Sequence, residues 1–510
     1  MNKSLACWLV LLCGLVGWEE AWALQTVADE YPWRVGAASV EMLAEDSMVI
    51  GGGIGPGFTQ GQEGKLQATA TYIQSDGPQN EGAVCVVAVD VLMMHRDTMD
   101  LAATCVSEAC GLPLERIMIN TSHTHHAPST VTVHGYPRDE EFCLRAVDAI
   151  VEAAILAQKK ARAAEPSRGL FHRGREETVG QNSRQKLDDG QIYWIGPREN
   201  VVGPTDPFDP DFPVLAFRSA QDQLQAAWFN HSTHCIGTRT GRRSPGFYGL
   251  AAQELTDEHL MPVAFLSGAA GSTHNLTLDC DEMVRRIKAA FTESLTQAAP
   301  MKSTRLAGIR REVPFSIRMF DDQVEDKKVM DYCLKYATSH ADPIINVFRE
   351  SRRQLKPQQG AERTMWLQVM QVGDVYLVAV PAEYFTVLGL EIKRRSPFPN
   401  TFVCGLSNDY VGYLPDRKGF QNGGYQTWMG LHCFAEVGTG ELVVEQCLEM
   451  LNELVALPGT DKAPANSTNE EQPSQTHAGG EGANQNFRAG AAAVDITPTE
   501  LPRIIAGGFL

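Results

Sequence analysis

Apolar residues in the first half of the chain are grouped so that strands and helices alternate. The run 83–91 is apolar and rich in β-branched residues, which predicts a buried strand. Residues 97–110 have helical spacing and stop before Gly111, a common helix end, and 116–120 is a second strand-like run. A strand, a helix and a second strand in this order predict a parallel pair.

The same patterns continue along the chain. Residues 139–164 have the period of one long helix. Apolar runs that predict further strands cover 212–217, 225–229, 262–266, 366–372, 375–380 and 402–405. Gly373-Asp374 separates two of these runs and is typical of a hairpin turn. The predicted fold is therefore α/β, a mixed sheet with helices on its faces.

The first residues have the pattern of a secretory signal. Within 1–23, Lys3 provides the positive start, 5–18 an apolar core, and Ala21-Trp22-Ala23 a cleavage site. The apolar core is shorter than the roughly 20 residues that cross a bilayer, so an uncleaved anchor is the weaker alternative. We expect a mature chain from Leu24 without a transmembrane span, exported to the periplasm, the cell envelope or the medium.

The last part of the chain changes in character. Residues 458–486 are polar and rich in Pro, Ser, Asn and Gly, which predicts a disordered linker after a domain at 24–457. Residues 487–496 then repeat the pattern of 33–42, with arginine, glycine, valine and an acidic residue in register. We expect 487–510 to be the truncated start of a second copy of the domain.

Composition excludes some partners. The formal net charge is −18, so nucleic acid or an anionic bilayer would meet repulsion, and no nucleic-acid partner is expected. The 12 cysteines show no C-x-x-C spacing, which gives no zinc-ribbon or redox motif. Disulfides are compatible with export, and buried free thiols are the simpler interpretation of cysteines in apolar runs, such as Cys85, Cys143 and Cys404.

The densest group of ionisable side chains follows a predicted strand. It reads Asn-Thr-Ser-His-Thr-His-His-Ala-Pro at 120–128. His123 and His125 share one face of an extended backbone, whereas His126 points elsewhere. Because open α/β sheets carry their sites at the carboxyl ends of strands, this position favours a functional role.

Two more strand ends carry histidines. His231 and His234 follow the predicted strand 225–229, and His274 lies in the loop after 262–266. A single histidine is usually structural, but three such strand ends favour a metal site at the carboxyl ends of the strands. Catalytic zinc needs three or four ligands and one open position. Glu383 and Tyr425 are the candidates for the remaining ligands.

Several short motifs occur in a fixed order along the chain. They are Arg34-Val35-Gly36-Ala37, His123-Thr124-His125, Asn182-Ser183-Arg184, Gly203-Pro204, Asp209-Pro210, His234, Gly268-Ala269-Ala270-Gly271, Glu383, and Gly405-Leu406-Ser407-Asn408 with Tyr410, Tyr413 and Tyr425. In this order and spacing, they resemble the catalytic domain of the neutral, non-lysosomal ceramidases, especially bacterial tandem-domain relatives, over nearly all of 33–455.

The resemblance implies an activity and a set of roles. It implies Zn²⁺ as cofactor, with the ligands His123, His234, Glu383 and Tyr425. It also implies His125 as a proton handler, Tyr413 as a hydrogen-bond donor near the scissile carbonyl, and Arg184 as a substrate or oxyanion contact. The implied enzyme is an exported zinc-dependent amidohydrolase acting on an N-acyl amine, which could be a ceramide-like lipid or another small-molecule amide.

The chain also departs from the ceramidase pattern. His274 stands where the family has a serine, and it could act as a base, face the metal or hydrogen-bond within its loop. His126-Ala127-Pro128-Ser129 replaces Ser-Gly-Pro-Gly, and no β-sandwich domain follows. No apolar surface segment indicates a lipid groove, so another amide or ester substrate is open.

Two other functions compete with this interpretation. One is a noncatalytic relative that serves as an envelope binding or scaffold module. The other is a metallohydrolase of phosphate or sulfate esters, which the acidic charge and the lack of a P-loop disfavour. The sequence does not indicate an oligomeric state.

Overall fold

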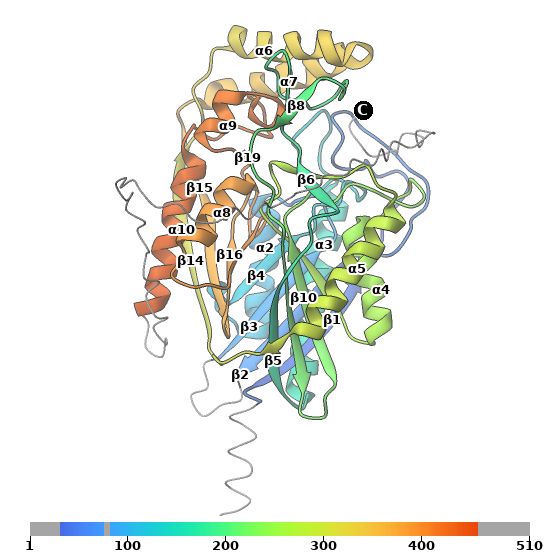
Figure 1. The fold of residues 1–510 in the computed structure, drawn as a ribbon, viewed down its shortest axis with the longest axis vertical. Coiled ribbons are helices and arrows are strands. Elements are labelled where there is room, and N and C mark those ends of the chain that lie inside the picture. Colours follow the sequence, from blue (N-terminus) through green and yellow to red (C-terminus); the bar gives the residue numbers. More distant parts are fainter. Residues whose placement is uncertain (1–30, 76–81, 457–510) are drawn as a thin grey trace, which may run out of the picture.

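The computed structural model describes residues 31–75 and 82–456 as two β-sheets packed face to face, with helices on both outer sides (Figure 1). The mixed α/β architecture predicted from the sequence is confirmed. The expected signal at 1–23, the linker at 458–486 and the second-copy start at 487–510 lie outside the described residues.

The larger sheet has the strand order β11-β10-β9-β5-β1-β2-β3-β4, with β13 (Ala299–Pro300) paired to β5. Its strands are β1 (Trp33–Glu41), β2 (Gln67–Ser75), β3 (Ala83–Val89), β4 (Ile117–Thr121), β5 (Pro166–Arg175), β9 (Asp211–Ser219), β10 (Leu224–His231) and β11 (Val263–Ser267). The pairs β3/β4 and β10/β11 are parallel and the other pairs are antiparallel. The predicted strand, helix and strand at 83–120 thus form a parallel pair joined by α2 (Arg96–Cys110).

The smaller sheet has the order β14-β15-β16-β18. Its strands are β14 (Leu306–Ser316), β15 (Glu362–Val372), β16 (Val375–Ala379) and β18 (Thr401–Cys404). The predicted hairpin is β15/β16, and Gly373 in its turn has φ +60°, which favours glycine. The sequence did not indicate that these strands form a sheet of their own.

Side chains alternate between two cores along each central strand. In β16, Val375, Leu377 and Ala379 pack between the sheets, and Tyr376 and Val378 face the helices. Successive residues of a strand point to opposite faces, so a strand in the middle of this sandwich needs apolar residues at every position. This explains why the central strands appear in the sequence as unbroken apolar runs.

Helices cover the outer faces. The larger sheet is covered by α2, α3 (Glu140–Ala163), α4 (Gly246–His259) and α5 (Cys280–Gln297), and the smaller sheet by α8 (Thr386–Arg395) and α10 (Thr439–Ala456). Two further helices, α6 (Asp322–Tyr336) and α7 (Ala341–Leu355), lie beyond one end of the sheets, at the top of Figure 1. The remaining short elements are η1 (Leu114–Arg116), β6 (Gly180–Asn182), β7 (Gln185–Leu187), β8 (Val201–Pro204), β12 (Thr273–Asn275), η2 (Thr338–His340), η3 (Lys356–Gln358), β17 (Glu383–Tyr384), β19 (Tyr413–Leu414), α9 (Arg417–Asn422) and η4 (Tyr425–Thr427).

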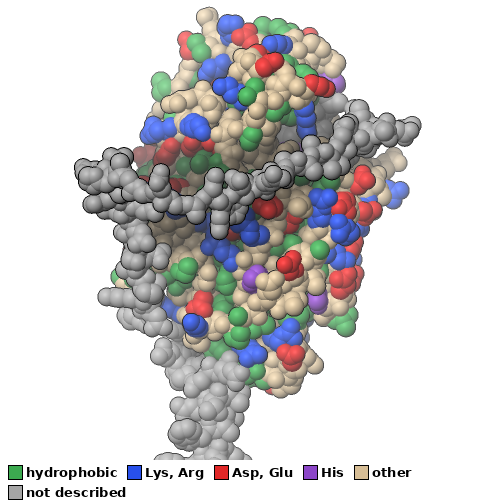
Figure 2. All heavy atoms as spheres, viewed as in Figure 1, with side chains coloured by type: hydrophobic (Ala, Val, Ile, Leu, Met, Phe, Trp, Pro, Cys, Tyr) green, Lys and Arg blue, Asp and Glu red, His purple; other side chains and the backbone are tan. Residues whose placement is uncertain are grey.

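The charged side chains of one face and the cysteines show no special arrangement in the described residues. Acidic and basic side chains are interspersed on the face shown in Figure 2. Across 31–75 and 82–456, every cysteine is a free thiol, and Cys85, Cys143 and Cys404 are buried. In the same residues, no helix has both the length and the apolar character needed to span a bilayer.

Residues 34–37 of β1 pack directly against α3. Arg34 donates to the carbonyl of Ala164 at the end of α3 (2.6 Å), a favourable place for a cation. Gly36 faces the helix backbone so closely that an added Cβ would lie 2.3 Å from the carbonyl oxygen of Ala157. The glycine therefore sets how closely α3 approaches the sheet.

Gly36→Ala should destabilise the protein by about 1–3 kcal/mol, because the helix must move away from the sheet. Gly57→Ala is the control, since open space surrounds that position and its φ is not positive. Urea unfolding followed by circular dichroism measures both variants. Equal stability of the Gly36 variant and wild type would contradict the close packing.

Candidate functional site

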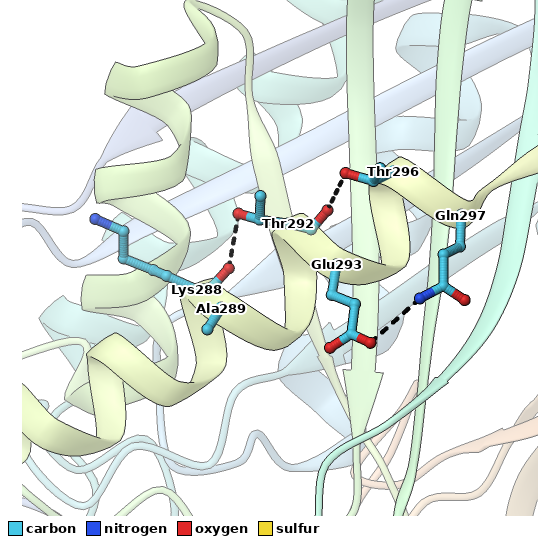
Figure 3. A pocket seen from close by; sticks show the side chains of 6 residues that line it. All are labelled: Lys288, Ala289, Thr292, Glu293, Thr296 and Gln297. Carbon is cyan, nitrogen blue, oxygen red and sulfur yellow. Dashed lines mark hydrogen bonds between the residues drawn. The ribbon is translucent and has the colours of Figure 1, made fainter.

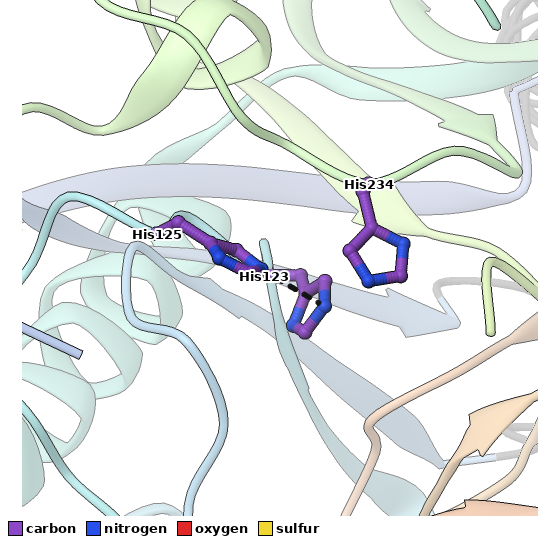
Figure 4. A group of neighbouring side chains, drawn as sticks. All are labelled: His123, His125 and His234. Carbon is purple, nitrogen blue, oxygen red and sulfur yellow. Dashed lines mark hydrogen bonds between the residues drawn. The ribbon is translucent and has the colours of Figure 1, made fainter. Parts of the chain in front are cut away.

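Three histidine rings from two loops converge at one point (Figure 4). His123 and His125 follow β4, and His234 follows β10. One ring nitrogen from each lies within 4.8 Å of the others, and all three side chains are buried. The ring centroid of His123 is 4.9 Å from that of His125 and 4.5 Å from that of His234. The two loops that the sequence indicated are therefore brought together.

Buried hydrogen bonds join the strand ends beneath these loops. Asn120, at the end of β4, donates from Nδ2 to the carbonyl of Gly405 (2.6 Å) and to Ser407 Oγ (2.9 Å). Its Oδ1 accepts from the backbone N–H of Ser267 at the end of β11 (2.8 Å). One side chain thus connects both sheets directly below the histidines.

His123 and His234 are each held in place by a hydrogen bond at ring atom Nδ1, and His123 also has an unusual backbone conformation. His123 has φ +59°, a left-handed conformation that costs a non-glycine residue about 1–3 kcal/mol. Its Nδ1 lies 3.0 Å from the carbonyl of Leu92, and Nδ1 of His234 lies 3.0 Å from that of Ala270. A carbonyl can only accept, so both Nδ1 atoms carry the proton and both Nε2 atoms keep a free lone pair.

Glu383 provides a carboxylate to the same point. Its Oε2 is 3.4 Å from Nε2 of both His123 and His234, and its Oε1 accepts from the hydroxyl of Tyr410 (3.0 Å). Burial would raise the pKa of Glu383, but the close approach of His123 and His234 outweighs burial and holds the pKa well below its usual range. The carboxylate is therefore ionised at neutral pH.

His125 approaches the group from one side. Its Nε2 is 3.4 Å from Nε2 of His123. Burial, followed by the neighbouring histidines His123 and His234, lowers the pKa of His125 well below its usual value, and burial likewise lowers the pKa of His234. Both rings are therefore neutral at neutral pH. Neutral imidazoles and one carboxylate are a donor set that suits zinc.

Three tyrosines, Tyr410, Tyr413 and Tyr425, line a small cavity of about 10 Å³ beside Glu383. The hydroxyl of Tyr413 is 3.3 Å from Nε2 of His234. The hydroxyl of Tyr425 instead lies 3.1 Å from Nε2 of His134. Burial and the nearby Glu383 raise the pKa of the phenols of Tyr413 and Tyr425 well above the usual value, so both keep their protons in this structure.

Arg184 is fully buried and bound to the protein itself. Its guanidinium donates to the carbonyls of Gly419 (3.0 Å) and Gly423 (2.6 Å) and to Oε1 of Gln426 (2.9 Å). Burial lowers the pKa of Arg184 to about 10, so it remains a cation at neutral pH. It is not part of the lining of either cavity at the site. Its contacts hold the segment that carries Tyr425.

The other predicted histidines lie around the group. His274, on β12, stacks on His234 with ring centroids 5.1 Å apart, and burial lowers its pKa to about 3. His126 accepts from the backbone N–H of Gly237 through Nε2 (2.9 Å). His231 bonds the carbonyl of Glu176 (3.0 Å) and belongs to the scaffold.

Two further histidines complete the surroundings and were not singled out in the sequence. His134 Nδ1 bonds the carbonyl of Gly53 (3.0 Å), which directs its Nε2 to Tyr425. His432 Nε2 bonds the carbonyl of Tyr425 (3.0 Å), and the two rings stack 4.9 Å apart. Neither histidine belongs to a motif or follows a predicted strand, so no local signal identified them.

An apolar pocket of about 570 Å³ adjoins the histidines. His125 and His126 form its inner wall, and Trp194 links it to Tyr425 through ring stacking at 4.5 Å. The sequence did not indicate such a pocket because its walls come from distant segments. A separate shallow hollow on α5 (Figure 3) shares no residue with this site, and its threonines bond only to their own helix.

Because His126 is buried and neutral, the free energy of unfolding should depend on pH in the acidic range. Burial lowers the pKa of His126 to about 4, against about 6.5 in an unfolded chain. Between these values only the unfolded state takes up the proton, so the free energy of unfolding should fall as the pH is lowered from 6.5 towards 4. The loss from this one residue is at most about 1.4 kcal/mol per pH unit.

In His126→Gln, the amide oxygen can still accept from Gly237 but cannot titrate. Urea unfolding between pH 7 and pH 4.5 should show a shallower pH dependence in this variant than in wild type. Identical slopes would mean that His126 does not stay neutral in the fold.

The chain is similar to known proteins in its fold rather than in its sequence. No protein-family model and no curated protein matches its sequence. Among solved structures, it is similar to neutral ceramidase from Pseudomonas aeruginosa, with a TM-score of 0.64 and 17% identity over 85% of this chain and 76% of that one. A structure described as ceramidase complexed with C2 gives a TM-score of 0.62 and 17% identity, covering 85% and 77% of the two chains. The chain therefore has a neutral ceramidase-like fold.

Proposed function

We propose that this chain is an exported, zinc-dependent hydrolase that cleaves the amide bond of an N-acyl amine, with ceramide-like lipids among its candidate substrates. The observation that carries the proposal is the placement of Glu383 Oε2 3.4 Å from Nε2 of both His123 and His234, beside an apolar pocket. The likeness of the fold to a neutral ceramidase supports the same class of reaction.

His123, His234 and Glu383 would hold the metal, because their lone pairs face one another. Tyr425 lines the same small cavity and would be the fourth ligand, with Nε2 of His134 in place to receive its phenolic proton. When bound, zinc supplies Lewis acidity and a nucleophile at neutral pH. The donors are two imidazoles, a carboxylate and a phenol, a set of nitrogen and oxygen ligands that zinc accepts.

His125 and Tyr413 would act on the substrate. The neutral ring of His125 faces the apolar pocket on one side and His123 on the other, so it can accept a proton from the nucleophile and return it to the leaving amine. Tyr413 keeps its phenolic proton and can donate a hydrogen bond to the oxyanion that forms at the scissile carbonyl.

Arg184 and His274 would be positioning residues. Arg184 bonds the carbonyls of Gly419 and Gly423 and so holds the segment that carries Tyr425. His274 stacks on His234 and fixes the plane of that ring. The assignment of Arg184 differs from the direct contact that the resemblance implies, and that of His274 differs from the base that its position could also provide, since neither residue lines the pocket.

Metal content and turnover should separate the ligands from the proton handler. Wild type should purify with about one zinc per chain, as expected for a catalytic site with protein ligands only from this chain. His234→Ala and Glu383→Gln should lose both the metal and hydrolysis of an N-acyl amine. His125→Gln should keep the zinc and lower kcat by roughly 10²–10⁴, the range of general acid–base catalysis.

Zinc content is measured by elemental analysis of the purified variants, and activity is measured as the initial rate of hydrolysis of an acylated amine. His172→Gln on β5, away from the three histidines, is the matched control and should retain both zinc and activity. Loss of zinc in His125→Gln would make His125 a ligand. Stoichiometric zinc without turnover on a broad panel of amides and esters would support the noncatalytic alternative.

A further inference from the structure

Different segments of the chain line the pocket beside the histidines. One wall is the loop at 50–59 and the opposite wall is α7, and His125 lies between the pocket and the other two histidines. The apolar side chains of the lining include Ile50, Ile54, Phe58, Ile195, Ile344 and Val347. Phe58 is 63% exposed although it is aromatic, which places apolar surface at the rim. Such a pocket suits the aliphatic part of a ligand.

The permanently charged side chains in the lining of this pocket are of one sign. The chain has 62 acidic and 44 basic residues, yet the lining contains no aspartate and no glutamate. Arg242 is the one lysine or arginine among the lining residues. The pocket therefore has a permanent positive charge in a protein that is negative overall.

Arg242 also differs from the arginines next to it in the sequence. Arg239 forms an ion pair with Glu254 (2.6 Å), and Arg243 forms one with Asp46 (2.7 Å). Arg242, between them, has no hydrogen bond or ion pair with any residue of 31–75 or 82–456. Its guanidinium thus has its full donor capacity available for a ligand.

The backbone beneath Arg242 is held in place. The hydroxyl of Thr59 donates to the carbonyl of Gly241 (3.0 Å), and Nη1 of Arg243 donates to the carbonyl of Thr59 (3.1 Å). These bonds attach both neighbours of Arg242 to the loop at 50–59. The side chain of Arg242 is exposed, and its backbone is held at the pocket.

We infer that the substrate portion in this pocket carries an anionic group, a carboxylate, sulfonate or phosphate, which Arg242 binds. The inference rests on the proposed amide hydrolysis and deepens it by naming an acidic amide lipid as the substrate class. A guanidinium presents paired N–H donors that match the oxygens of such groups, and a charge-assisted bond beside an apolar wall is stronger than one in open water. The absence of lining carboxylates removes any competing partner.

The test compares matched acidic and neutral amides. N-dodecanoylglycine and N-dodecanoylethanolamine share the acyl chain and differ in whether the amine part ends in a carboxylate. An ω-carboxydodecanoyl ethanolamide places the acid on the acyl part instead. Wild type should prefer one of the two acidic amides over the neutral one by about tenfold in kcat/KM, a size expected for one partly exposed charged hydrogen bond. The preferred probe identifies the part of the substrate that fills the pocket.

Arg242→Gln should reduce the preference to about twofold or less, because kcat/KM should fall more for the acidic amide than for the neutral one. Arg242→Glu should reverse the preference, because the introduced carboxylate repels the acid. Raising the salt concentration should weaken the wild-type preference, since the arginine is exposed. Arg285→Gln is the control, as Arg285 lies on α5 and pairs with Glu282. It should behave as wild type.

Binding separates this inference from the proposed activity. If none of the amides is hydrolysed, the amidase proposal fails, and titration calorimetry with the same probes still shows whether Arg242 selects the acid. Equal rates and equal affinities for acidic and neutral amides in wild type would overturn the inference. So would an acid preference that persists unchanged in Arg242→Gln.

Discussion

The site depends on a carboxylate that is buried among rings. Glu383 is 5% exposed and lies 3.4 Å from Nε2 of His123 and of His234, and burial lowers the pKa of His234. A buried anion that has no cationic partner is costly by several kcal/mol. Tyr410 contributes a neutral hydrogen bond, which offsets only part of that cost. A divalent cation at the meeting point of these lone pairs would satisfy the carboxylate and both histidines at once.

The scaffold serves to bring these groups together from distant parts of the chain. Asn120 joins the ends of β4 and β11 to the loop after β18, and this places the loop of His123 close to the segments around Glu383. The left-handed backbone of His123 turns its ring into the group. A cost of strain at a functional residue is tolerated when surrounding contacts over-determine it, as the bond of its Nδ1 to Leu92 does here.

The pocket forms where segments that are distant in the sequence meet, and one of these segments carries Arg242. α7 packs beyond the ends of the sheets and supplies one wall, while the loop at 50–59 supplies the other. Trp194, from another segment, also lines the pocket and stacks on Tyr425. One layer of side chains therefore separates this pocket from Tyr425.

Some of this arrangement could be predicted from the sequence. The run at 83–91 and the hairpin at Gly373 were identifiable because strands buried on both faces are continuously apolar. The strand β5, which contains Arg168, Arg173 and Arg175, was not identified, because its partners rather than its own side chains make it a strand. His123, His234 and Glu383 were marked by their place after strands. His134 and Asn120 have roles that depend on contacts hundreds of residues away, and no local pattern encodes those contacts.

The central claim is that one zinc ion lies between His123, His234 and Glu383. Diffraction from crystals of the purified protein, recorded on both sides of the zinc absorption edge, tests it most directly. A single anomalous peak is expected about 2.0–2.1 Å from Nε2 of each of the two histidines, with an oxygen of Glu383 at a similar distance. No peak at this position in zinc-supplemented crystals, or a peak held by other residues, would contradict it.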